Sequence, residues 1–150
     1  MKNVYVVADN IFTPLGGTSA ENFEKLKAGQ SGIKKQPASA ISDVPFYGAL
    51  FDDTIFPSEN NEYTKFEQLL IASVSDALSI AQINPTDSKT LLIISSTKGN
   101  ISLLENNEAT PDVKDRIALH ASAKLIANHF GFVHTPVIVS NACISGIMAI

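Results

Sequence analysis

The 150-residue sequence is poor in cysteine and contains no long apolar run. A single cysteine, Cys143, excludes an internal disulfide framework and suits a reducing compartment. No apolar run approaches the roughly 20 residues that a bilayer-spanning helix needs. The N-terminal segment also lacks the long apolar core and small-residue cleavage site of a signal peptide. These absences predict a soluble, cytoplasmic protein that does not associate with membranes.

Basic charge is scarce as well. Eleven Lys and Arg residues face 15 Asp and Glu residues, which gives a net charge of −4 and a pI near 5.2. Nucleic-acid-binding domains usually carry a concentrated basic face, and here the lysines are scattered. We therefore expect no nucleic-acid partner. The apolar fraction of 45% is that of a globular protein.

Metal-binding patterns are absent from the sequence. The chain has three histidines, at His120, His129 and His134. They lack the H-x-x-x-H spacing of a common zinc site, so we expect no metal and assign these side chains polar helix-face or loop roles. The acidic residues Asp52, Asp53 and Glu59 form no evident acid–base pair. Solvation is the role expected of them.

Short β-branched runs predict three buried strands, at residues 4–8, 91–95 and 136–140. Proline and glycine make residues 30–63 an irregular region, within which 46–51 is a candidate for a short strand. Strands that alternate with long helices are typical of the α/β class. The pattern therefore predicts a mostly parallel sheet with helices on its faces.

Four helices are expected between and after these strands. The first runs from Ser19 to Lys27, with Thr18 to Glu21 as a capping box and an end near Gly29. The second covers Thr64 to about Ile83 and should be buried on most sides, because its apolar stripe is wide. The third is capped by Thr110 and continues unbroken to Phe130, where Gly131 ends it. Its many alanines suggest close packing against another helix, and a last helix begins at Gly146.

Cys143 lies between the strand expected at 136–140 and this last helix. In parallel sheets, reactive groups gather at the carboxyl ends of strands. Unpaired N–H groups in the first turn of a helix, and the positive end of its dipole, favour the thiolate form and can also stabilise an oxyanion. The small residues Ala142, Ser145 and Gly146 leave space for a substrate, and Gly146 permits close backbone packing. The competing interpretation is that Cys143 is a small buried hydrophobe.

Three short motifs follow one another along the chain. They are T-P-L-G at 13–16, A-G-x-S-G-I at 28–33 and A-C-x-S-G at 142–146. In this order, over nearly all 150 residues, the chain resembles the N-terminal portion of the β-ketoacyl-acyl-carrier-protein synthases, which are thiolase-like condensing enzymes. The resemblance implies the first half of a layered α-β-α-β-α architecture that ends just after the nucleophile elbow. We therefore expect a truncated chain, a split gene or an incomplete sequence.

The resemblance also implies a chemistry. Cys143 would accept an acyl chain as a thioester, with its backbone N–H in the oxyanion hole. The enzyme would then decarboxylate malonyl-acyl carrier protein, and the carbanion would attack the acyl group to give a 3-oxoacyl chain in fatty-acid or polyketide synthesis. Substrates would arrive on the phosphopantetheine arm of the acyl carrier protein, and no cofactor would take part. The family's catalytic histidines and lysine lie beyond the matched portion, so the fragment alone is expected to be inactive in condensation.

The same resemblance implies a homodimer or heterodimer that pairs through the strand at 136–140. Two departures from the family pattern fit a divergent synthase of a specialised pathway: VADNI at 7–11 lacks the glycines of I-T-G-x-G, and SSTKGN at 95–100 replaces a glycine-rich stretch. Two alternatives stay open. One is a non-catalytic partner subunit of the same fold that sets chain length, which the presence of Cys143 disfavours. The other is a thiolase, against which the T-P-L-G and A-C-x-S-G motifs argue.

Overall fold

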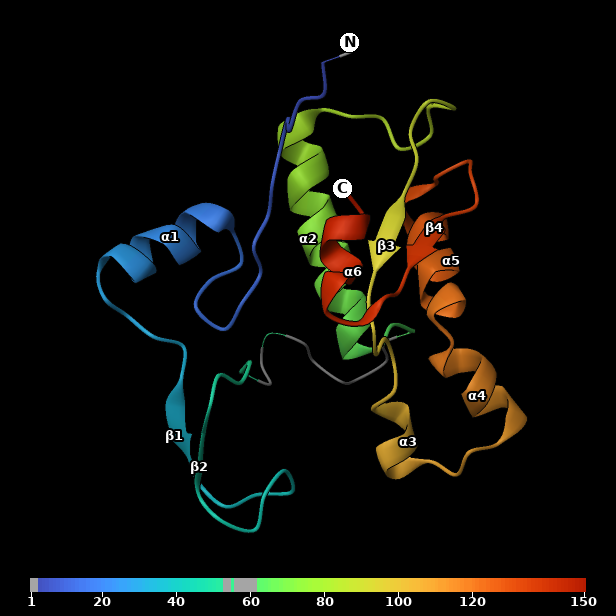
Figure 1. Ribbon diagram of the computed structural model, residues 1–150. Helices are drawn as coiled ribbons and strands as arrows, with labels where there is room; N and C mark the ends of the chain where they lie inside the picture. The colour runs from blue at the N-terminus through green and yellow to red at the C-terminus, as the bar shows by residue number, and fades with distance from the viewer. Residues whose placement is uncertain (1–2, 53–54, 56–61) are drawn as a thin grey trace. The chain divides into compact units, whose positions relative to one another are not determined.

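The computed structural model describes residues 3–52, 55 and 62–150, and its elements fall into two compact units, Met1–Ala81 and Gln82–Ile150. The first unit contains α1 (Ser19–Lys27), β1 (Lys34–Gln36), β2 (Phe46–Gly48) and α2 (Lys65–Ala81) (Figure 1). The second contains β3 (Ile93–Ser95), α3 (Leu103–Asn106), α4 (Pro111–Ile117), α5 (Leu119–Phe130), β4 (Val137–Val139), the 3-10 turn η2 (Ala142–Ile144) and α6 (Ser145–Met148). The chain is therefore of mixed α/β structure, as the sequence predicts.

Asn22 of α1 organises the T-P-L-G turn. Thr13 and Gly16 exchange two backbone hydrogen bonds of 2.9 and 3.0 Å across this turn. The buried Asn22 side chain accepts from the Thr13 hydroxyl. Its amide nitrogen lies 2.8–2.9 Å from the carbonyl oxygens of Ile11, Gly16 and Thr18. A buried amide that is satisfied in this way fixes the loop against the helix.

The helix α1 begins and ends where the sequence predicts. The Thr18 hydroxyl accepts from the Glu21 N–H at 3.2 Å, which is the expected N-cap. The Glu21 carboxylate accepts from the Gly17 N–H at 2.8 Å, one residue earlier than a strict capping box requires. Gly29, with a φ of 68°, follows the last turn.

The helix α2 starts with a reciprocal capping box. The Thr64 N–H donates to the Glu67 carboxylate at 2.9 Å, and the Glu67 N–H donates to the Thr64 hydroxyl at 3.3 Å. Its expected burial on most sides is wrong in this chain. Apolar side chains along α2 are half-buried, and Ile80 is 57% exposed.

Asn10 connects the N-terminal segment to α2 within the first unit. Its amide nitrogen donates to Asp76 at 2.7 Å, and its amide oxygen accepts from the Ser73 hydroxyl at 2.7 Å. The strand predicted for residues 4–8 is wrong. The segment has no backbone hydrogen bond to any other described segment, and its side chains are mostly exposed, with Val4 at 93%. β-branched residues favour an extended chain, but a strand also needs a paired neighbour.

The region predicted to be irregular contains a small antiparallel sheet. Strands β1 and β2 pair with Lys35 opposite Tyr47, so the candidate strand at 46–51 is confirmed for residues 46–48. The strand at 34–36 was not expected, because it is short and polar. Of the three carboxylates assigned to solvation, Asp52 is exposed, as expected, while Asp53 and Glu59 lie outside the described residues.

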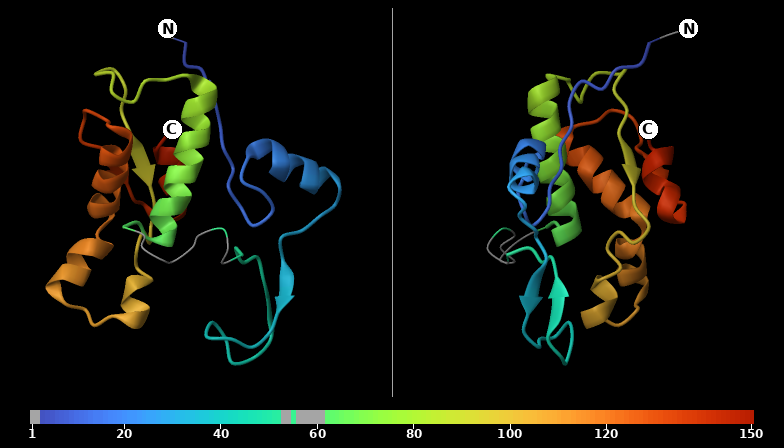
Figure 2. Two further views of the ribbon diagram at one scale, coloured as in Figure 1. Left: turned by 180° about the vertical axis from the view of Figure 1, so that it is seen from behind. Right: turned by 60° about the vertical axis from the view of Figure 1, so that its left-hand side comes forward.

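The second unit is built around one parallel strand pair. The predicted strands at 91–95 and 136–140 are found as β3 and β4, which pair with Ile94 opposite Ile138. Helices α5 and α6 lie on opposite sides of this pair (Figures 1 and 2). The core side chains are Leu92, Ile94, Ala123, Ile126 and Ala127. The alanine-rich helix α5 was expected to pack against another helix. It contacts the neighbouring helix α4, and it also packs against strand β4.

The helix predicted to run unbroken to Phe130 is divided at Ala118, whose ψ of 133° is extended. Nothing in the local sequence breaks it. The buried Asn100 amide donates to the Ser122 hydroxyl at 2.9 Å and lies 3.4 Å from the Arg116 carbonyl oxygen. In a continuous helix that carbonyl would accept from an N–H four residues later. The tertiary hydrogen bond from Asn100 offers it another partner and accompanies the break.

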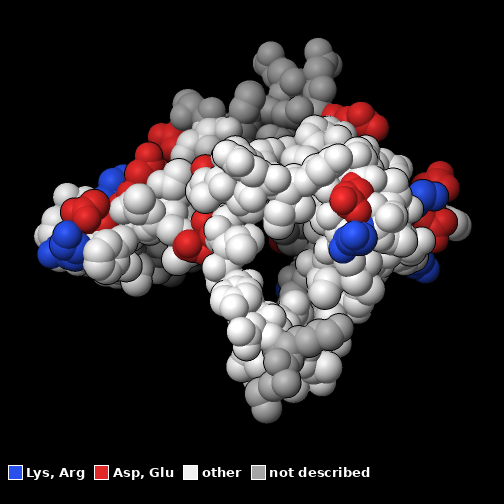
Figure 3. Space-filling model, turned by 90° about the horizontal axis from the view of Figure 1, so that it is seen from above, with Lys and Arg blue, Asp and Glu red and all other residues white. Residues whose placement is uncertain are grey.

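Among the described residues, the sheets are one parallel and one antiparallel pair, so the predicted mostly parallel sheet is confirmed only in the second unit. No helix in the described ranges is long and apolar enough to cross a membrane. On the face seen in Figure 3, lysine and arginine side chains stand singly or beside acidic ones, and most of the surface is uncharged.

Candidate functional site

Cys143 lies in the turn η2, directly after strand β4 and before α6. The residue is exposed, and its thiol is free. Its predicted place, at the carboxyl end of a parallel strand, is where the structure puts it. The competing interpretation of a buried core cysteine does not hold for this chain.

The backbone just before Cys143 has an unusual conformation. Ala142 has a φ of 43°, in the left-handed region that non-glycine residues seldom adopt. Such a conformation costs about 1–2 kcal/mol, so the surrounding hydrogen bonds must hold it. Strained residues of this kind gather at functional sites.

Ser145 supplies the hydrogen bonds that hold this turn. Its hydroxyl accepts from the Asn141 N–H at 2.7 Å and donates to the Ala142 carbonyl at 2.8 Å. The Ile144 N–H also donates to the Asn141 carbonyl at 3.1 Å. Ser145 is only 5% exposed, whereas Cys143 beside it is open to solvent. The hydroxyl therefore closes a loop of backbone around the residue that carries the thiol.

Sequence reasoning assigned Ser145 only the role of a small neighbour and missed this function. A serine in the first turn of a helix commonly bonds nearby backbone, which was the available signal. The expected close packing at Gly146 is also wrong, because a Cβ there would meet nothing within 4 Å. The open space at Gly146 does agree with room for a substrate. The helix α6 has four residues, so its dipole contributes less to a thiolate than a long helix would.

The histidines take no part in this turn. His134 Nε2 donates to the Ser88 carbonyl at 2.6 Å, and the His129 ring meets the Phe130 ring edge-on at 4.8 Å. Across the described ranges, the Cys143 thiol has no hydrogen bond to a histidine or to any other residue. The same ranges hold no group of three side chains that could bind a metal ion.

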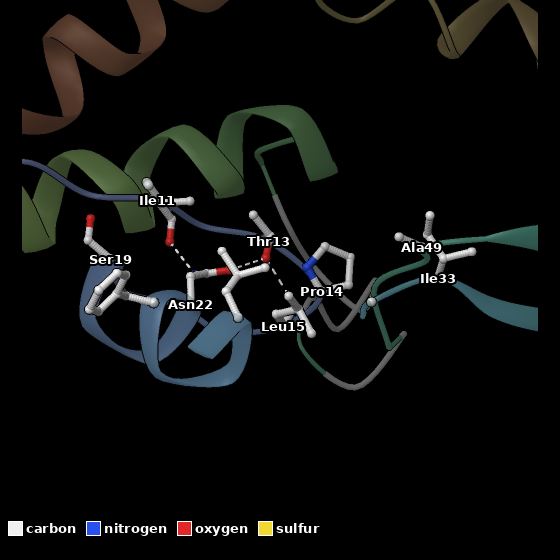
Figure 4. Close-up of a pocket in the computed structure, with 11 residues that line it drawn as sticks. Ile11, Thr13, Pro14, Leu15, Ser19, Asn22, Ile33 and Ala49 are labelled. Atoms are coloured by element: carbon white, nitrogen blue, oxygen red, sulfur yellow. Dashed lines mark hydrogen bonds between the residues drawn. The ribbon is translucent and has the colours of Figure 1, made fainter. Parts of the chain in front are cut away.

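The cavity shown in Figure 4 lies in the first unit and has a volume of about 350 Å³. Apolar side chains dominate its walls, among them Ile11, Pro14 and Leu15 from the N-terminal segment. Of its polar residues, Thr13 and Asn22 bond each other, as drawn, and Asn22 also bonds the Ile11 carbonyl. These two groups hold the loop and offer a ligand little polar recognition, so the buried Ser19 Oγ, which has no hydrogen-bond partner among the described residues, is the polar group left in the lining.

Among known proteins, no family model and no curated protein matches the chain. Function must therefore be argued from the turn at Cys143 and from the sequence pattern around it.

Proposed function

We propose that Cys143 is the acyl-accepting nucleophile of a β-ketoacyl-acyl-carrier-protein synthase with the thiolase-like fold. The observation that carries the proposal is an exposed thiol on a strained turn that directly follows the parallel strand β4. The ordered T-P-L-G, A-G-x-S-G-I and A-C-x-S-G motifs add the chemical class. Helix α5, the β3–β4 pair and helix α6 form three successive layers, and such an α-β-α succession is compatible with part of the layered thiolase-like fold.

The proposed step is a thioester exchange. The Cys143 thiolate attacks the carbonyl carbon of an acyl group carried on the pantetheine arm of an acyl carrier protein. The bond from that carbon to the pantetheine sulfur breaks, and the released sulfur takes up the proton that Cys143 gave up. Backbone N–H groups in the turn would stabilise the oxyanion between these events. No metal or cofactor is needed for this exchange.

Decarboxylation of a malonyl thioester requires further groups. None of the chain's histidines bonds Cys143 in the described ranges, and none lies in the family's histidine motifs. The proposal therefore assigns acyl transfer, and not the complete condensation, to these residues. We expect the chain by itself to form no 3-oxoacyl product from a malonyl thioester.

A dimer through residues 136–140 is part of the proposal. Strand β4 pairs with β3 along one edge, and no other described strand pairs with its second edge. Val137 on this strand is 43% exposed. An unpaired edge with an exposed apolar side chain is suited to pairing with a second copy or with a related subunit.

Alkylation kinetics test the proposal. Iodoacetamide should modify Cys143 several-fold faster in the folded chain than in the same chain unfolded in urea, because a positioned thiolate is the reactive species. The reaction is followed by intact mass, and Cys143→Ala serves as the unlabelled control. Equal or slower labelling of the folded chain would overturn the proposal.

A further inference from the structure

A second cavity, of about 390 Å³, lies between α5 and the loop that leads into β4. All of its lining residues belong to the second unit. One wall is the α5 row His120, Lys124 and Asn128, and the other includes Phe132, Val133, His134, Pro136 and Ile138. Its volume falls within the ~300–1,000 Å³ of small-molecule sites. Cys143 does not line this cavity.

Polar groups on α5 present unused hydrogen-bond donors to the cavity. His120, Lys124 and Asn128 recur every four residues, so they form one row along the helix. All three are exposed, and within the described ranges their side chains have no hydrogen-bond or ion-pair partner. Lys124 is the only formally charged residue in the lining. The lining contains no carboxylate, so this cavity carries a positive formal charge although the net charge of the chain is −4.

His134 lies in the loop that forms the second wall of the cavity, and a hydrogen bond fixes its imidazole ring. Its Nε2 donates to the Ser88 carbonyl, since a carbonyl oxygen can only accept. This bond of 2.6 Å holds the ring and leaves Nδ1 for a second interaction. Lys124 thus gives the polar side of the cavity its positive charge, and His120 and His134 also line the cavity.

Apart from Thr135, the rest of the lining is apolar. Ala127 is buried, and Phe132, Pro136 and Ile138 are half-buried around the cavity. A ligand that satisfies both sides needs one anionic group and one apolar group. We propose that this cavity binds a small organic acid, with its carboxylate at Lys124 and its short hydrocarbon part against Phe132 and Ile138. The site is independent of Cys143 and of acyl transfer.

Titration of the ¹⁵N-labelled chain with hexanoate, followed by two-dimensional NMR, tests the inference. Saturable shifts should concentrate on amides of residues 120–138. Hexan-1-ol, which has the apolar part without the charge, and inorganic phosphate, which has charge without the apolar part, should each bind at least tenfold more weakly. Equal affinity for hexanol or for phosphate would overturn the assignment, as would shifts that are unsaturable or scattered over the whole chain.

Substitutions separate this site from other surfaces. Lys124→Gln should weaken hexanoate binding by about tenfold, the scale of one charge-assisted contact. Lys114→Gln, an exposed lysine on α4, is the matched control and should leave the affinity unchanged. Both positions are on the surface, so a well-dispersed spectrum confirms that each variant is folded. Equal affinities of the two variants would contradict the role of Lys124. Cys143→Ala should bind hexanoate as the parent does, whether or not Cys143 proves to be a nucleophile.

Discussion

The Ser145 hydroxyl accepts a hydrogen bond from the Asn141 N–H at 2.7 Å, across the turn that carries Cys143. The same hydroxyl returns a hydrogen bond to the Ala142 carbonyl. One buried side chain thereby bonds both the left-handed Ala142 and the residue before it. The Ser145 hydroxyl thus holds the turn that carries the thiol.

Ser145→Ala should loosen this turn. The Asn141 N–H and the Ala142 carbonyl would lose their bonds to the Ser145 hydroxyl, so we expect the free energy of unfolding to fall by about 0.5–1.5 kcal/mol. Alkylation of Cys143 in the folded variant should slow toward the rate of the unfolded chain. Ser145→Thr keeps a hydroxyl and should retain more of the parent labelling rate. Parent-like labelling in Ser145→Ala would show that the hydroxyl does not position the thiol.

Asn100→Ala should destabilise the second unit more than the loss of an exposed amide side chain does. Asn100 is buried and bonds the Ser122 hydroxyl, so its loss leaves polar groups unsatisfied and should cost about 1–3 kcal/mol. The matched control is Asn107→Ala, which removes an exposed amide that bonds the Leu103 carbonyl. That change should stay within about 0.5 kcal/mol. Urea unfolding measures both variants, and equal losses would argue against the buried network.

Gly131→Ala should lower the stability of the chain, whereas Gly146→Ala should leave it nearly unchanged. Gly131 ends α5 with a φ of 75°, where an L side chain costs about 1–2 kcal/mol. Gly146 has open space at its Cβ position and no left-handed φ, so alanine should be tolerated there. Thermal unfolding compares the two. A Gly131→Ala variant as stable as Gly146→Ala would contradict the proposed αL end of α5.

Features that depend on neighbouring residues were predictable from the sequence. The cap of Thr18 on α1 and the stop at Gly131 are set within one turn, and both are found. The two apolar strands at 91–95 and 136–140 were recognisable because each is a short β-branched run. Cys143 could be placed for the same reason, since it directly follows one of these strands.

Features that depend on distant partners were not predictable. The break at Ala118 accompanies a hydrogen bond from Asn100, which is 16 residues from its acceptor Arg116. Residues 4–8 have the composition of a strand, but they find no partner among the described segments. The role of Ser145 needed the geometry of the turn, because its sequence context shows only a small polar residue. In each case a tertiary contact decides the outcome, and local pattern cannot reveal it.

The central claim is tested most directly by acyl transfer to Cys143. The folded chain is incubated with octanoyl-pantetheine, digested and mapped by mass spectrometry. The account predicts one octanoyl group per chain on the peptide with Cys143, released by neutral hydroxylamine as a thioester is, and absent from Cys143→Ala. No adduct on the folded chain, or only hydroxylamine-resistant acylation of lysines, would contradict it.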